Sequence, residues 1–127
     1  MEQDEWARNS AYPHYTLRDW AEAVHNTALD KGWWTEERTI GDQIALMHSE
    51  LSEALEEYRN GHNVKDVYFV TDKDGHQKPE GVAVELIDCI IRICDTLARF
   101  GVNPQHIMAL KAEYNTTRPY RHGGKTL

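Results

Sequence analysis

Cysteines are scarce in this sequence and long apolar runs are absent, and each absence excludes a class of protein. The chain has 127 residues and two cysteines, Cys89 and Cys94, too few for the disulfide framework of a small secreted domain. If their segment is helical, the thiols point about 140° apart, which predicts free, buried side chains in a reducing compartment. No apolar stretch reaches the roughly 18 residues of a membrane span. We therefore expect a cytoplasmic protein with no membrane partner, and no signal peptide at its acidic start, Met1 to Asp4.

Basic residues are also in the minority. The chain carries 14 lysines and arginines against 21 aspartates and glutamates, a formal net charge of -7. A protein that binds duplex nucleic acid needs a basic face for the phosphates, so this balance argues against such a partner. Polyanionic ligands remain possible if a metal ion or local basic residues receive them.

The chain does have enough apolar material for one domain. Its hydrophobic content of 40%, with 9% aromatic residues, predicts a single folded domain over residues 1–127. A domain of this size buries a modest fraction of its surface. A helix that is apolar on most sides would need neighbours from a second copy, so we expect a homo-oligomer, either a dimer or a tetramer.

Caps and turn residues divide the chain into helices, an insert and a tail. The insert, about residues 62–79, holds four strand formers from Val67 to Val70 and the turn dipeptide Asp74-Gly75, which predicts a small hairpin or ordered loop. The tail, residues 117–127, is polar and basic. The fold class is therefore expected to be all-α. Four helices are expected: Leu17 to Lys31, Thr35 to Asn60, Glu80 to Phe100, and His106 to Thr116 after the cap Asn103 and Pro104.

Two of the expected helices carry carboxylates at the same spacing. Glu50 and Glu53 lie three residues apart on one flank of the second helix, and Glu85 and Asp88 repeat the spacing on the third. The third helix is apolar over most of its circumference, so its polar residues share a stripe about 100° wide. If the two helices pack antiparallel, the four acids meet in one cleft, where unneutralised charges would repel one another strongly.

Two interpretations of these acids stay open on the pattern alone. In the first, they form a solvated face in which Asp88 and Asp95 pair with arginines four residues later, at a gain of a few tenths of a kcal/mol per pair. In the second, a hard dication neutralises them, and oxygen-only ligands indicate Mg²⁺ or Mn²⁺. The seven histidines offer no zinc spacing, so a Cys/His metal site is not expected.

The runs around these acids resemble the all-α nucleoside triphosphate pyrophosphatases, in particular the MazG-like branch. The family motif reads EExxE, a spacer, then ExxD, and it is matched by Ser49 to Glu53 and by Glu85 to Asp88. Ser49 stands where many members have the first glutamate, and the spacer is long because of the insert. The resemblance covers roughly residues 17 to 125 and rests on the runs His48 to Ala54, Glu80 to Asp88 and Tyr114 to Lys125.

The resemblance implies a four-helix, oligomeric protein that cuts (deoxy)nucleoside triphosphates to monophosphate and pyrophosphate with Mg²⁺ or Mn²⁺. The metal would be held by Glu50, Glu53, Glu85 and Asp88. A carboxylate among the first three would take the proton of the attacking water. Two alternatives remain: hydrolysis of a phosphoribosyl-nucleotide, and a non-catalytic helical dimerisation module whose acids serve solubility.

Two further groups of residues complete the expected site. Cations and an asparagine near the C-terminus suit phosphate oxygens, although a frayed basic tail is the alternative. On the first helix and the turn after it, a tryptophan could stack on a nucleobase while polar side chains bond its edge, or the tryptophan could fill the core. The expected phosphate ligands are Lys111, Asn115, Arg118, Arg121 and Lys125, and the expected base ligands are His25, Asn26 and Trp34.

Overall fold

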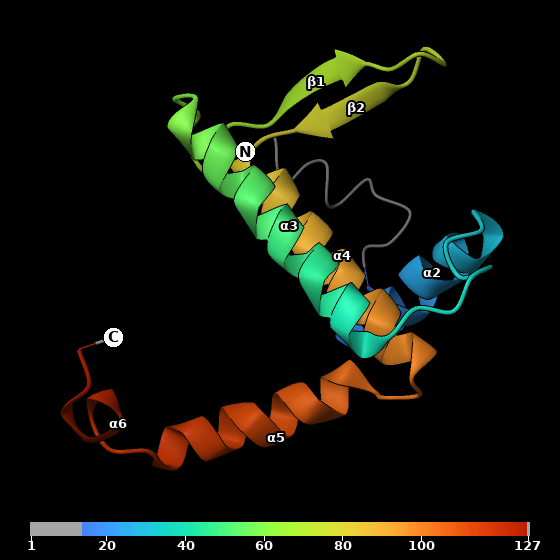
Figure 1. Cartoon of the computed structure of the whole chain (residues 1–127). Helices are drawn as coiled ribbons and strands as arrows, with labels where there is room; N and C mark the ends of the chain where they lie inside the picture. The colour runs from blue at the N-terminus through green and yellow to red at the C-terminus, as the bar shows by residue number, and fades with distance from the viewer. Residues whose placement is uncertain (1–13, 127) are drawn as a thin grey trace.

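The computed structural model describes residues 14–126, which form five helices and a two-stranded sheet (Figure 1). The expectation of a mostly helical chain is confirmed. The acidic start, Met1 to Asp4, lies outside the described residues. The elements are α2 (Leu17–Asp30), α3 (Ile40–Arg59), β1 (Tyr68–Thr71), β2 (Gln77–Glu80), α4 (Val82–Arg99), α5 (Pro104–Thr117) and the short α6 (Arg121–Gly124).

Matching capping boxes begin the first two helices. The Thr16 hydroxyl accepts the Asp19 N–H at 3.1 Å, and the Asp19 carboxylate accepts the Thr16 N–H at 2.9 Å. Thr39 and Asp42 repeat the arrangement at the start of α3, at 3.1 and 3.0 Å. The prediction that this helix begins near Thr35 is therefore wrong, because the next threonine along the chain supplies the cap.

Helices α3 and α4 lie side by side and run in opposite directions, with α2 packed against α4 (Figure 1). The Cys89 thiol on α4 donates to the Met47 carbonyl oxygen on α3 at 3.6 Å. Further along α4, the Thr96 hydroxyl donates to the Gln43 side-chain oxygen at 3.4 Å. Residue numbers rise on one helix as they fall on the other, which is the antiparallel packing that the acid spacing requires.

The insert folds as a hairpin, one of the two forms that the sequence left open. Strands β1 and β2 pair antiparallel, with Tyr68 opposite Glu80. The Tyr68 hydroxyl donates to both carboxylate oxygens of Glu57 at 2.9 Å, which anchors the hairpin to α3. Because Glu80 belongs to the second strand, α4 begins at Val82, two residues later than predicted.

Gly81 joins the hairpin to α4 in a conformation that only glycine adopts readily. Its φ is +138°, and a Cβ atom at this position would clash with the Asp66 carbonyl oxygen. The glycine therefore lets the chain turn tightly from β2 into α4. This turn places Glu85 in the first turn of α4, close to the base of the hairpin.

Helix α5 makes few contacts with the other described helices. The Asn103 side chain accepts the Gln105 N–H at 3.0 Å and Pro104 takes the first helical position, so the helix starts two residues before the predicted His106. Among the described elements, α5 contacts α2 and α4 but not α3, and its far end points away from both (Figure 1). The four-helix, MazG-like bundle and its assembly into oligomers therefore stay predictions.

Cys89 and Cys94 are buried and free of disulfide bonds, as predicted, and burial raises the pKa of the Cys94 thiol. Within residues 14–126, we find no helix whose length and apolar content would let it cross a membrane.

Candidate functional site

Three glutamates from α3 and α4 converge. Carboxylate oxygens of Glu50, Glu53 and Glu85 all lie within 4.8 Å of one another. Glu50 and Glu85 are buried, with 7% of each residue exposed, whereas Glu53 is exposed. Asp88, one turn further along α4, is half-buried and lines the same cleft as Glu50. The helix packing thus brings the four predicted acids together.

The cluster holds more negative charge than its surroundings neutralise. Burial, a hydrogen bond with Glu53 and the neighbouring negative charges raise the pKa of Glu85 to about 8. Its Oε2 atom is buried and has no hydrogen-bond partner within the described part of the chain. Burial and the Glu50 charge also raise the pKa of Asp88. Buried carboxylate oxygens are normally paired, so this orphaned atom indicates a missing partner.

Arg92 partly neutralises the cluster. Its Nε donates to Glu50 Oε1 at 2.6 Å, across the two helices. Burial alone would raise the pKa of Glu50, but the hydrogen bond from Arg92, with further hydrogen bonds involving Glu53 and Glu85, lowers it. Glu50 is therefore ionised at neutral pH while Glu85 binds a proton. Arg92 pairs here with α3, not with Asp88 as the solvated-face interpretation required.

The donor chemistry of the cluster suits a hard dication. Three carboxylates contribute oxygens at close range, and one buried oxygen lacks a partner, which fits the ligand preference of Mg²⁺ or Mn²⁺. A second group of acids, Glu57, Glu80 and Glu85, also has oxygens within 4.8 Å. Sequence reasoning missed Glu80, because its position depends on how the hairpin docks beside α4.

A cleft of about 510 Å³ adjoins the cluster and connects it to the turn after α2. Glu50 and Asp88 line its acidic part, and Trp33 and Trp34 line its aromatic part. Lys78 of the hairpin also lines the cleft and pairs with Glu80 at 3.0 Å. One cavity thus offers acids, a cation and aromatic rings, which are the groups that a nucleotide needs.

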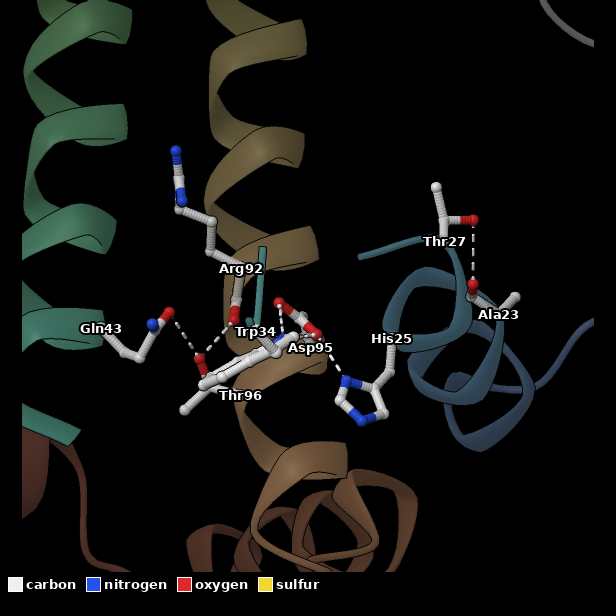
Figure 2. Close-up of polar contacts among 8 residues, drawn as sticks. All are labelled: Ala23, His25, Thr27, Trp34, Gln43, Arg92, Asp95 and Thr96. Carbon is white, nitrogen blue, oxygen red and sulfur yellow. Dashed lines mark hydrogen bonds and ion pairs between the residues drawn. The ribbon is translucent and has the colours of Figure 1, made fainter. Parts of the chain in front are cut away.

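Two of the three predicted base ligands meet at Asp95, which the sequence placed only in an ion pair with an arginine four residues later. Figure 2 shows His25 and Trp34 turned towards Asp95 of α4. His25 Nδ1 lies 2.7 Å from Asp95 Oδ1, and Trp34 Nε1 donates to both Asp95 oxygens at 3.0 and 3.1 Å. Trp34 is buried, and the Arg99 guanidinium lies 4.9 Å from its ring centroid. Asn26, the third predicted base ligand, is exposed.

The Asp95 network gives a direct stability prediction. We expect Asp95→Ala to lower the free energy of unfolding by about 1–3 kcal/mol, because the Trp34 N–H and the His25 ring lose a shared acceptor in a mostly buried place. Urea denaturation measures the change. Glu37→Ala, which removes an exposed acid from the loop before α3, serves as the control and should stay within about 0.5 kcal/mol. Equal stability of the two variants would show that the network contributes nothing.

The predicted phosphate ligands lie on another part of the molecule. Lys111 and Asn115 are exposed on α5, and Arg118 follows at its end. Arg121 and Lys125 lie beyond, around the short α6. Figure 1 shows that α5 leaves from the end of the α3–α4 pair opposite the hairpin. Within one chain, the structure therefore does not bring these residues to the acids.

Comparisons with known proteins add no relative to this picture. No family model matches the chain, and neither curated proteins nor solved structures include a significant match. The function must therefore be argued from the residues and their geometry.

Proposed function

We propose that this protein is a magnesium-dependent nucleoside triphosphate pyrophosphohydrolase of the MazG-like type. The observation that carries the proposal is the buried pair Glu50 and Glu85 on facing helices, with one Glu85 oxygen unpartnered within the described residues. Burying acids without compensation is costly for a fold. A solvated acidic face would leave such side chains in water, so a cation that binds between the helices explains the burial better.

Glu50, Glu53, Glu85 and Asp88 would hold the ion, and Mn²⁺ could replace Mg²⁺. When bound, the ion would lower the pKa of a water molecule and offset the charge of the substrate phosphates. Glu53 is the exposed member of the three converging glutamates, so its carboxylate can accept a proton from a water that arrives with the substrate. We therefore assign the general base to Glu53.

The cleft would bind the rest of the nucleotide. His25 and Trp34 hold Asp95 between them, so we propose that they shape the wall of a base subsite. Trp33 lines the same cleft and is more exposed, so its ring can stack on a base. Lys78 lies near the acids and can meet phosphate oxygens.

One observation favours a second candidate, a helical dimerisation module. Large apolar side chains on the central helices are exposed, including Leu51 and Leu55 of α3 and Ile90 of α4. A surface of this kind suits association with another helix pair. The two functions are compatible in one protein, but a module without catalysis predicts no turnover of any nucleotide.

A nucleotide panel tests the proposal. The protein is incubated with deoxynucleoside and ribonucleoside triphosphates and with a phosphoribosyl-nucleotide, in magnesium or in EDTA, and phosphate is measured with malachite green after inorganic pyrophosphatase is added. We expect magnesium-dependent release that disappears without the added pyrophosphatase, since the product is pyrophosphate. Release without it would indicate loss of the terminal phosphate instead. No release from any substrate would favour the module.

A further inference from the structure

Three cations line the cleft beside its acids. They are Arg38, Lys78 and Arg92. Arg38, in the loop before α3, also lines a neighbouring pocket with Trp33, so it lies at the aromatic part of the cleft. Lys78 of β2 and Arg92 of α4 lie at the acidic part, since each pairs with a glutamate there. A ligand with phosphate groups can therefore find its counter-charges within the cleft.

The Arg92 guanidinium has donors to spare. Its Nε donates to Glu50 Oε1 at 2.6 Å, and among the described residues its two terminal nitrogens have no hydrogen-bond or ion-pair partner. The bond from Nε holds the guanidinium in place, and its remaining N–H groups suit the oxygens of a phosphate. Figure 2 shows the Arg92 side chain extended along α4, away from Asp95. A phosphate in the cleft can thus bind Arg92 without breaking the pair with Glu50.

The Lys78 ammonium is held in the same way. Its Nζ lies 3.0 Å from Glu80 Oε1, and this contact uses one of its three N–H donors. The hydrogen bond with Glu80 raises the pKa of Lys78 most, and the charges of Glu80, Glu85 and Asp88 raise it further. Lys78 is therefore a charged side chain that faces the acids of α4 and keeps two donors for a ligand.

The residues of α4 give the order of these groups along the cleft. Asp88, Arg92 and Asp95 all line it and lie four and three residues apart on one face of the helix. Asp95 bonds Trp34 at the aromatic part, whereas the charge of Asp88 acts on Lys78. Arg92 lies between the two, about 6 Å along the helix axis from Asp88 and about 4.5 Å from Asp95. A ligand that extends from the tryptophans towards the acids therefore reaches Arg92 before Lys78.

We propose that Arg92 and Lys78 form a phosphate subsite in which Arg92 binds the phosphate next to the sugar and Lys78 binds the phosphates beyond it. That the ligand is a nucleotide rests on the proposed function, whereas the binding of linked phosphates by the two cations does not. Glu50 bonds Arg92 through one oxygen and keeps the other for a metal ion. The subsite lies within one chain and needs none of the cations predicted on α5 and the tail.

Imidodiphosphate, an analogue of pyrophosphate that resists hydrolysis, probes the subsite without a nucleobase. Calorimetry in saturating magnesium measures its affinity. Arg92→Gln and Lys78→Gln should each weaken binding by about 10–100-fold, because each removes charge-assisted hydrogen bonds. The matched controls, Arg59→Gln and Lys73→Gln, remove exposed cations that do not line the cleft and should bind as the wild type does. Wild-type affinity in the Arg92 and Lys78 variants would overturn the subsite, and so would no binding by the wild-type protein.

Binding of Mn²⁺ alone distinguishes phosphate ligands from cations that only hold the fold together. Arg92→Gln and Lys78→Gln each remove a positive charge beside the acids, so both variants should bind Mn²⁺ at least as tightly as the wild type. Electron paramagnetic resonance of the free ion measures this affinity. If Arg92 only joined α3 to α4, or Lys78 only docked the hairpin, the variant would lose Mn²⁺ and imidodiphosphate together. Such a parallel loss would overturn the assignment for that residue.

Monophosphates and triphosphates test the order of the two cations. Both variants should bind α,β-methylene deoxynucleoside triphosphates more weakly, whereas only Arg92→Gln should lose affinity for deoxynucleoside monophosphates, by about 10-fold or more. Equal losses of monophosphate affinity in the two variants, or a loss confined to Lys78→Gln, would overturn the order. A protein that binds imidodiphosphate as expected but turns over no nucleotide would refute the proposed hydrolysis and leave the subsite standing.

Discussion

Glu53→Gln and Asp88→Asn, made separately, are each expected to lower magnesium-dependent nucleotide hydrolysis by about 1000-fold or more. Each change removes a carboxylate from the four-acid cluster, and a catalytic metal supplies several kcal/mol of transition-state stabilisation. In metal-free buffer the melting temperature should stay equal or rise, because one of several crowded negative charges is removed. Initial rates with the best nucleotide of the panel and thermal melts in EDTA measure the two effects.

Glu56→Gln is the matched control for these variants. Glu56 is exposed on α3, three residues beyond Glu53, and does not belong to either group of converging acids among the described residues. Its substitution should leave the rate unchanged. If the two cluster variants unfold in EDTA while the control does not, the acids are structural. Wild-type rates in both cluster variants would remove them from the chemistry altogether.

In the absence of metal, the contribution of Glu85 to the stability of the fold is expected to fall as the pH rises from about 4.5 to about 8. The folded-state pKa of Glu85, about 8, lies above the ordinary value of 4.5, so the folded protein holds this proton more tightly. The resulting stability is fully present below pH 4.5 and is lost as the pH rises through 8. Asp88 acts in the same direction, whereas Glu50 acts in the opposite one because its pKa is lowered.

Magnesium should reverse this loss. The ion competes with the proton for Glu85, so the rise in melting temperature on adding magnesium should be larger at pH 8 than at pH 6. At a concentration 100 times its dissociation constant, a bound ion stabilises the folded state by about 2.7 kcal/mol. Urea denaturation across this pH range, with magnesium or EDTA, measures both effects.

Glu85→Gln isolates the group responsible. The variant should show a flatter pH profile in EDTA and little stabilisation by magnesium, because it has neither the proton nor a charged ligand at this position. Glu56→Gln, which removes an exposed carboxylate outside both groups of converging acids, should keep the wild-type profile. An unchanged slope in Glu85→Gln would assign the pH dependence to another group.

Helix ends were predictable where a cap is local. Thr16, Asn103 and Pro104 begin their helices as the sequence indicates, since a cap bonds within the next few residues. The predicted start of α3 was wrong because Thr35 and Thr39 are both threonines that could cap a helix, and the sequence does not distinguish them. In the structure Thr35 belongs to the turn that precedes α3, where its hydroxyl donates to the Gly32 carbonyl oxygen at 2.9 Å.

The acid site was predictable in its members but not in its electrostatics. Helical periodicity places Glu50, Glu53, Glu85 and Asp88 on matching flanks, and antiparallel packing then brings them together. Which of them is ionised depends on a cation 42 positions away, because Arg92 reaches Glu50 across the helix pair. No spacing rule identifies that partner.

The sequence by itself determined the helical segments, the turn within the insert and the faces that carry the acids, because each depends on neighbours within a few residues. Only the tertiary structure decided that Glu85 is buried with a raised pKa, that Asp95 joins His25 to Trp34, and that α5 stands away from the acids. Desolvation, charge pairing and the direction of a helix depend on contacts between distant segments. Such contacts exist only once the chain has packed.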